Sequence, residues 1–212
     1  MEEFSKIAPL SPRWEERKGL KIVILGVGGV GGFALDCLYR SGFRNLTIVD
    51  GDRFDPSNRN RQIGSHRVGE LKVKVLEELY PGVVGVPFQL KPGDILKNPL
   101  LEGADLIIDA IDQMPVKEEI LFWYWFKLIS SMGAGRRLDP TKVEVAPFSK
   151  THTDPLARKL RSRLRKRGWE GDFLAVFSTE LPHRGEGSFV GVTGTFGFTL
   201  CSLVVRDRCR LG

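Results

Sequence analysis

The chain has 212 residues, of which 42% are hydrophobic and 27% are charged, which is the balance of a folded globular protein about one domain in size. It has no apolar stretch near the roughly 20 residues that cross a bilayer, and its first ten residues lack the apolar centre of a secretory signal, so we expect neither a membrane-spanning nor a secreted protein. Lysine and arginine number 32 against 26 acidic residues, and the net charge of +6 favours a polyanionic partner such as a nucleotide or RNA.

The chain contains three cysteines and no C-x-x-C pair. This is too few for a disulfide framework, and it argues against a structural zinc site of the common kind. A reducing, cytoplasmic compartment is therefore expected.

The first structured unit is predicted after an N-terminal arm of about 20 residues that has no strong periodicity. The β-branched run 21–25 and the run 46–50 are predicted strands, and 33–41 has helical spacing. A glycine-rich turn at 26–32 joins the first strand to the helix. Strand, turn, helix and strand at this spacing indicate a βαβ unit with parallel strands.

The rest of the chain continues to alternate between strands and helices. The predicted strands are 83–90, 104–110 and 143–145, and the predicted helices are 68–80 and 116–129. This order predicts an α/β fold, doubly wound and Rossmann-like, with a mostly parallel sheet and a C-terminal extension. We expect an arm at 1–20, a nucleotide-binding domain at 21–150, and a segment at 151–212 whose basic helix and short strands pack on that domain.

The glycines of the first turn form the pattern Gly26-x-Gly28-x-x-Gly31, with a further glycine at Gly29. Glycine allows the backbone to turn sharply and approach a phosphate, and the helix that follows offers free N–H groups to that anion. Asp50 ends the second strand, where it can accept hydrogen bonds from a ribose. The alternative is a glycine-rich turn that only allows close helix–sheet packing.

A cationic and amide-rich segment, Asn58-Arg59-Asn60-Arg61-Gln62, follows Asp50 and Asp52. Arg61 can bind a phosphate through two hydrogen bonds, and Lys72 on the next helix can add a compact charge. A dinucleotide does not need this second cationic layer, whereas a triphosphate does. The alternative is that Arg59 and Arg61 are solvent-exposed loop charges.

Two carboxylates, Asp109 and Asp112, stand at the end of the strand 104–110. A carboxylate at this tip is expected to face the cleft, where Mg²⁺ is typically held by one or two carboxylates and by phosphate oxygens. Asp112 is the preferred metal ligand, with Asp109 beside it. The alternative is that one of the two caps the next helix.

Taken together, the motifs G-V-G-G-V-G, L-T-I-V-D, N-R-N-R-Q-I, V-G-x-x-K and D-A-I-D resemble those of the ubiquitin-activating-like adenylyltransferases. Three later stretches, at 133–142, 153–164 and 176–180, resemble the tRNA threonylcarbamoyladenosine dehydratase branch of that family. The resemblance covers about residues 20 to 205.

The resemblance implies that the protein uses ATP and Mg²⁺ to activate a carboxylate as an acyl-adenylate. In this branch the carboxylate belongs to the threonine moiety on adenosine 37 of tRNA, and the neighbouring ureido group then closes a ring and expels AMP. The V-G-x-x-K match favours Lys72 over Lys74. The resemblance implies catalytic roles for Arg61, Lys72 and Asp112, the last also as metal ligand, and nucleotide binding by Gly26, Gly28, Gly29, Gly31, Asp50, Asp52, Asn58 and Gln62.

Three other functions are compatible with the sequence. An adenylyltransferase for a ubiquitin-like sulfur-carrier protein belongs to the same superfamily, although such relatives generally carry the paired C-x-x-C motifs that this chain lacks. A nicotinamide-dependent oxidoreductase would share the glycine motif and Asp50. A non-catalytic nucleotide- or RNA-binding module is a further alternative.

Two further features concern macromolecular partners. A basic run could be a solvated helix face or a surface that follows the phosphates of tRNA. Its members are Arg158, Lys159, Arg161, Arg163, Arg165, Lys166 and Arg167. The aromatic stretch 121–128 is expected to be buried or to form a homodimer interface, and the resemblance favours the dimer.

Overall fold

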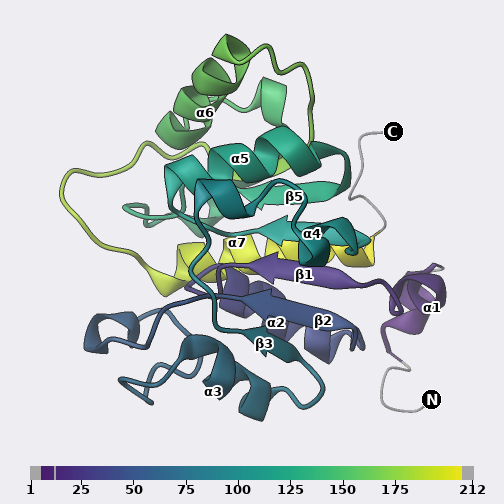
Figure 1. Cartoon of the computed structure of the whole chain (residues 1–212). Helices are drawn as coiled ribbons and strands as arrows, with labels where there is room; N and C mark the ends of the chain where they lie inside the picture. The colour runs from purple at the N-terminus through teal and green to yellow at the C-terminus, as the bar shows by residue number, and fades with distance from the viewer. Residues whose placement is uncertain (1–5, 12, 207–212) are drawn as a thin grey trace.

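A computed structural model describes residues 6–11 and 13–206, so Cys209 and the first residues of the arm lie outside the described part. Seven strands form one sheet in the order β3-β2-β1-β4-β5-β7-β6. Figure 1 shows β3, β2 and β1 side by side in this sheet. All neighbouring pairs are parallel except β6 and β7, which are antiparallel. The strands are β1 (Ile22–Leu25), β2 (Leu46–Val49), β3 (Val84–Val86), β4 (Leu106–Asp109), β5 (Leu128–Ser131), β6 (Val143–Pro147) and β7 (Leu174–Ser178).

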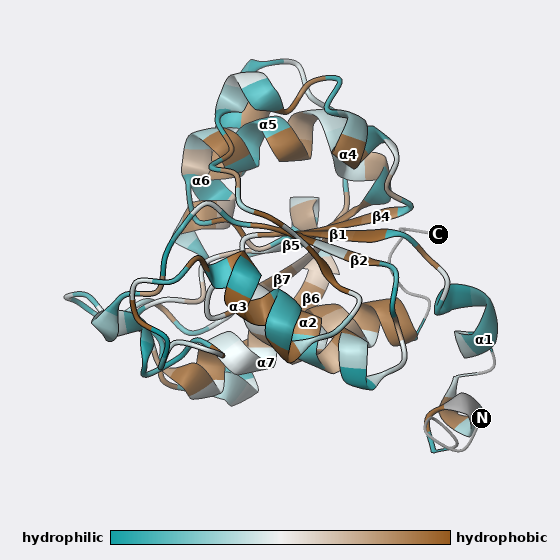
Figure 2. Ribbon diagram, turned by 60° about the horizontal axis from the view of Figure 1, so that its bottom comes forward, coloured by the Kyte–Doolittle hydropathy of each residue, from teal (hydrophilic) through white to brown (hydrophobic). Residues whose placement is uncertain are grey.

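Helices cover both faces of this sheet, as the doubly wound fold requires (Figure 2). The α-helices are α1 (Trp14–Arg17), α2 (Gly31–Arg40), α3 (Lys72–Leu79), α4 (Pro99–Glu102), α5 (Met114–Tyr124), α6 (Pro155–Lys166) and α7 (Val190–Val205). Within the described ranges, no helix is both long enough and apolar enough to span a bilayer.

Side-chain alternation along the central strands builds two separate cores. Ile22 and Ile24 of β1 face one core, which includes buried residues of α2, α3 and α7. Val23 and Leu25 face the other, which includes buried residues of α4, α5 and α6. Because both faces are covered, strands β1, β2, β4 and β5 are buried at every position, as expected for a parallel sheet.

The strand order reverses direction beside β1. The chain runs outward from β1 through β2 to β3, and then returns to β4 on the other side of β1. The carboxyl ends of β1, β2, β4 and β5 therefore open along one edge of the sheet, where such folds hold their ligands.

The predicted helix at 116–129 is wrong in its second half. The helix α5 ends at Tyr124, and Leu128 begins strand β5 after a single 3₁₀ turn. Each residue of β5 is buried. A short buried strand has no polar alternation, so the sequence pattern could not separate it from the apolar helix before it.

The C-terminal part was also predicted incompletely. Its strand β7 is present and lies between β5 and β6 in the main sheet. The apolar segment 196–205, to which no secondary structure was assigned, belongs to the long helix α7. Three glycines and several β-branched residues in α7 disfavour a helix, but α7 packs closely along α2, and this tertiary contact outweighs local propensity.

Candidate nucleotide-binding site

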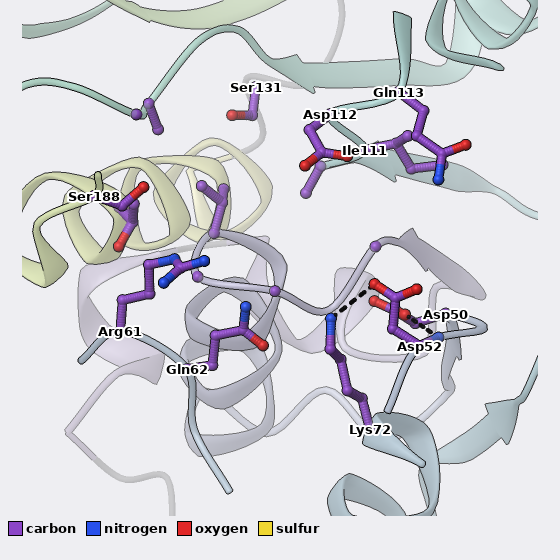
Figure 3. A pocket seen from close by; sticks show the side chains of 18 of the residues that line it. Asp50, Asp52, Arg61, Gln62, Lys72, Ile111, Asp112, Gln113, Ser131 and Ser188 are labelled. Carbon is purple, nitrogen blue, oxygen red and sulfur yellow. Dashed lines mark hydrogen bonds and ion pairs between the residues drawn. The ribbon is translucent and has the colours of Figure 1, made fainter. Parts of the chain in front are cut away.

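A cavity of about 340 Å³ opens at the carboxyl ends of the parallel strands (Figure 3). Its wall is built from the loops that follow β1, β2, β4 and β5, together with the segment around Arg61, Lys72 at the start of α3, and Ser188 and Thr193 near the start of α7. Residues distant in sequence therefore meet at the point where the strand order reverses.

The glycine turn forms the floor of this cavity, and its members have different roles. Gly28 and Gly29 line the cavity. Gly26 also lines it and has a φ of +80°, a conformation that favours glycine. Gly31 is absent from the wall, and a Cβ placed there would lie 1.8 Å from the carbonyl oxygen of Gly26. Gly31 thus allows the helix to approach the strand, which was the packing alternative for the turn.

Asp50 is fixed by the backbone around it. One carboxylate oxygen accepts the N–H of Val27 at 2.9 Å, and the other accepts the N–H of Asp52 at 2.8 Å. Burial raises the pKa of the Asp50 carboxyl, and the charge of Lys72 opposes this effect. A carboxylate has about four lone-pair positions, so two remain for hydroxyl donors in the cavity.

Lys72, and not Lys74, reaches the cavity. Its ammonium lies 2.9 Å from Oδ2 of Asp52, and its side chain is 7% exposed. The side chain of Lys74 is 51% exposed and pairs with Glu77 at 2.6 Å on the outer face of α3. Of the two lysines, only Lys72 lines the cavity, and its catalytic role stays a prediction.

Arg61 and Gln62 enter the cavity from the loop before α3, whereas Arg59 is exposed and is absent from the wall. The Arg61 guanidinium donates hydrogen bonds to the carbonyl of Ser57 and to the side chain of Asn60. These two bonds fix the position of the guanidinium in the wall. The Oε1 atom of Gln62 is buried and has no hydrogen-bond partner among the described residues. Such an atom is expected in a site that a ligand or ordered water completes.

Asn58 does not contribute a side chain to the cavity wall. It is buried, and its Oδ1 accepts the N–H of Asp55 while Asp55 accepts the N–H of Ser57. The direct ligand role expected from the motif is therefore not supported. Asn58 instead shapes the turn that presents Arg61.

The two carboxylates at the end of β4 are separated by the structure. Asp112 lines the cavity, as expected for a metal ligand. Asp109 is completely buried and binds Lys117 and Ser130, so the expectation that it faces the cleft is wrong. Among the residues that the structure describes, no group of three or more acidic, histidine or cysteine side chains could hold a metal. A cation here would therefore take most of its ligands from phosphate oxygens and water.

Two parts of the wall were not predicted from the sequence. One is an apolar section with Phe88, Leu90 and Ile111, and the other is the segment 131–135 after β5. The second was missed because β5 itself was not recognised. An apolar section in the same wall as Asp50 is suited to a purine base, since base faces bind to apolar side chains.

The basic helix α6 begins at the cavity, where Leu156 lines the wall. Six of the seven basic residues lie in this helix and Arg167 follows it; three of the seven bind within the protein. Arg163 and Arg167 contact Glu118, and Arg161 contacts Thr151. The other four are exposed, and within the described residues they have no ion-pair partner: Arg158, Lys159, Arg165 and Lys166.

Residues 13–161 match the ThiF family. The chain is 35% identical to the tRNA threonylcarbamoyladenosine dehydratase of Bacillus subtilis, over 79% of this chain and 70% of that protein. It is 32% identical to the enzyme of the same name from Haemophilus influenzae, over 87% and 84% of the two chains.

A solved structure is similar over almost the whole chain. It is the E. coli tRNA N6-threonylcarbamoyladenosine dehydratase in complex with ATP, with a TM-score of 0.86 and 31% identity over 98% of this chain and 93% of that one. The chain belongs to the ThiF family, and within it to the branch of the tRNA threonylcarbamoyladenosine dehydratases.

Proposed function

We propose that this protein uses ATP to dehydrate N6-threonylcarbamoyladenosine at position 37 of tRNA, closing a ring on the modified base. The observation that carries this proposal is the cavity at the strand ends. It combines a glycine floor, a fixed carboxylate at Asp50 and two cations, Arg61 and Lys72, in one wall. The relatives from B. subtilis and H. influenzae bear the name of this activity, and the similar E. coli structure contains ATP.

The arrangement suggests a direction for ATP in the cavity. The apolar section with Phe88 and Ile111 suits the adenine, and the free lone pairs of Asp50 suit the ribose hydroxyls. Arg61 lies on the opposite side of the cavity from Asp50 (Figure 3), where it suits the phosphates. In this direction the α-phosphate lies over Gly28 and Gly29, whose lack of side chains leaves room for an attacking carboxylate.

Arg61 and Lys72 would act through charge. Formation of an acyl-adenylate joins the substrate carboxylate to the α-phosphate and releases pyrophosphate, so negative charge grows on the phosphate oxygens. A guanidinium and an ammonium already held in position can offset that charge without further reorganisation. The ureido nitrogen then attacks the activated carbonyl carbon within the same substrate, AMP leaves, and positioning supplies most of the rate.

A magnesium ion fits the residues at this site. Asp112 lines the cavity near the loop after β4 and is the residue that would hold the ion. When bound, Mg²⁺ would neutralise negative charge on the phosphates. Asp112 and the phosphates are both anionic, so Asp112 would act on the phosphates only through the ion.

We also propose that tRNA contacts the exposed cations of α6, because this helix starts at the cavity and carries four unpaired positive charges within the described part of the chain.

We further propose that the protein forms a homodimer. The aromatic side chains of Trp123, Trp125 and Phe126 are 38%, 40% and 56% exposed and could lie in the contact. Light scattering of the purified protein tests the dimer.

The deciding experiment for the activity is mass spectrometry of nucleosides from tRNA that carries N6-threonylcarbamoyladenosine. Incubation with the protein, ATP and Mg²⁺ should reduce the mass of this nucleoside by one water and release AMP and pyrophosphate. Reactions without ATP are the control. If the mass is unchanged while a carrier protein ending in Gly-Gly is adenylated, the chain is instead a carrier adenylyltransferase.

A further inference from the structure

The three sequence stretches that are typical of the dehydratase branch meet at one loop. Arg137, from the first stretch, is buried and pairs with Asp154, from the second, at 2.9 Å. Its Nε donates to the carbonyl of Glu180, from the third, at 2.9 Å. Together, these two contacts fix the backbone of the loop that contains Arg137.

Glu180 holds the same loop from outside. Its carboxylate accepts the backbone N–H groups of Leu138 and Asp139, at 3.1 and 2.9 Å, and also binds His183 at 2.8 Å. The residue that this frame presents is Arg136, whose φ is +60° and whose side chain is exposed. The same frame holds one wall of the nucleotide cavity, because Asp154 accepts the N–H of Gly133 at 3.2 Å. On its other side the loop borders a further feature.

That feature is a second cavity of about 190 Å³ on the outer side of the loop. Its wall includes Arg136, Arg184 and Phe189. Two backbone hydrogen bonds join its sides, from the N–H of Arg136 to the carbonyl of Gly187 at 2.9 Å, and from the N–H of His183 to the carbonyl of Arg136 at 2.7 Å.

The two cavities adjoin each other. Ser188 lines both of them, and its carbonyl accepts the side chain of Asn60, next to Arg61, at 2.9 Å. Figure 3 shows Ser188 on the same side of the nucleotide cavity as Arg61, away from Asp50 and Asp52. The second cavity therefore opens at the end where the phosphates, and hence the reacting carboxylate, are expected.

The chemistry of the second cavity is that of a site for single-stranded RNA. Arg136 and Arg184 are exposed guanidiniums, which bind phosphates and stack on bases. The ring of Phe189 is 43% exposed and offers a face for a base. Glu186 is the one carboxylate in the described wall, and the neighbouring His183 is already bound to Glu180.

We propose that this cavity binds the unpaired nucleotides beside the reacting adenosine of the tRNA anticodon loop, with Arg136 and Arg184 on their phosphates and Phe189 against a base. The proposal rests on the proposed function, since it assigns the part of the site that receives the RNA. It differs from the contact on α6, which would follow the RNA backbone farther from the reaction.

The test is the double variant Arg136→Ala/Arg184→Ala, together with Phe189→Ala. Both arginines are exposed, so the fold should be retained, and thermal unfolding checks this. The matched control is Lys18→Ala/Arg40→Ala, which removes two exposed charges at the other end of the strands. Each protein is assayed for kcat/KM with modified tRNA, for the KM of ATP, and for binding of a labelled anticodon stem-loop by fluorescence anisotropy.

For the double variant we expect kcat/KM for tRNA and stem-loop affinity to fall at least about tenfold, while the KM of ATP changes less than about twofold. The slope of log affinity against log salt should fall by about 1 to 1.5. Phe189→Ala should weaken stem-loop binding with no change in that slope. The control should match the wild-type protein.

Stem-loop affinity equal to that of the control would overturn the proposal, and so would an equal loss of ATP binding, which would place the arginines in the nucleotide site. The binding measurement does not depend on turnover. If the wild-type protein fails to dehydrate the nucleoside, the proposed function fails, while stem-loop binding still decides the role of the second cavity.

Discussion

The ammonium of Lys117 lies 2.6 Å from Oδ2 of Asp109, and neither side chain is exposed to solvent. The same Asp109 oxygen accepts the hydroxyl of Ser130, and Lys117 also donates to the carbonyl of Ile111 at 3.0 Å. The pair thus joins the end of β4 to α5 and fixes the loop on which Asp112 stands. Asp109 and Lys117 position the site and do not contact the cavity.

Replacement of one partner of this pair should strongly lower the stability of the protein. In Lys117→Met the Asp109 carboxylate stays buried without its counter-charge, and we expect the free energy of unfolding to fall by about 3–5 kcal/mol. The double variant Asp109→Leu/Lys117→Met should recover much of this loss, because no buried charge remains. Denaturant unfolding measures both. Equal stability of the wild-type and Lys117→Met proteins would show that the pair is not a structural element.

Arg61→Ala should reduce adenylation by about 100- to 1,000-fold, since it removes one preorganised charge from the phosphate end of the cavity. The matched control is Arg59→Ala, which removes the same charge two residues away from an exposed position outside the wall. Pyrophosphate release measures both, and circular dichroism checks the fold. Similar activity of the two variants would contradict the role given to Arg61.

Lys72→Ala and Lys74→Ala should differ in the same assay. Lys72 is nearly buried and lines the cavity, so its loss should raise the KM of ATP and lower kcat. Lys74 is on the outer face of α3, and its loss should change stability by less than about 0.5 kcal/mol and leave activity intact. A reversal of this order would show that the V-G-x-x-K assignment is wrong.

Asp112→Asn should change the response to magnesium. The amide keeps the size of the side chain but binds Mg²⁺ less well than a carboxylate, so more Mg²⁺ should be needed for half-maximal activity. Titration of the activity with Mg²⁺ at fixed ATP gives this value, and removal of the metal with a chelator should abolish the reaction. An unchanged Mg²⁺ requirement would remove Asp112 from the metal site.

Loss of the four exposed α6 cations should weaken tRNA binding and flatten its salt dependence, because fewer counterions are released on binding. The variant changes Arg158, Lys159, Arg165 and Lys166 to Ala and keeps the three cations that bind within the protein. Affinity is measured at several salt concentrations. An identical slope would assign this helix to a solvated face.

Local patterns were sufficient for much of the fold. The run 21–25, the glycine turn and Asp50 predicted the first βαβ unit, because apolar period and glycine positions are local properties. They failed at β5, where four buried residues follow an apolar helix without a change of pattern. They also left the apolar segment 196–205 unassigned; it lies in α7, whose helical state is stabilised by its packing on α2.

For the site, the sequence by itself determined the kinds of groups present: glycines at the end of a strand, a carboxylate after the next strand, and a loop rich in arginine and amide. Which of these groups line the same cavity depends on the tertiary structure. Asp109 and Asp112 both stand at the end of the same predicted strand, but one pairs with Lys117 in the core and the other lines the cavity. The direction of a side chain depends on what packs around it, and residues distant in sequence supply that environment.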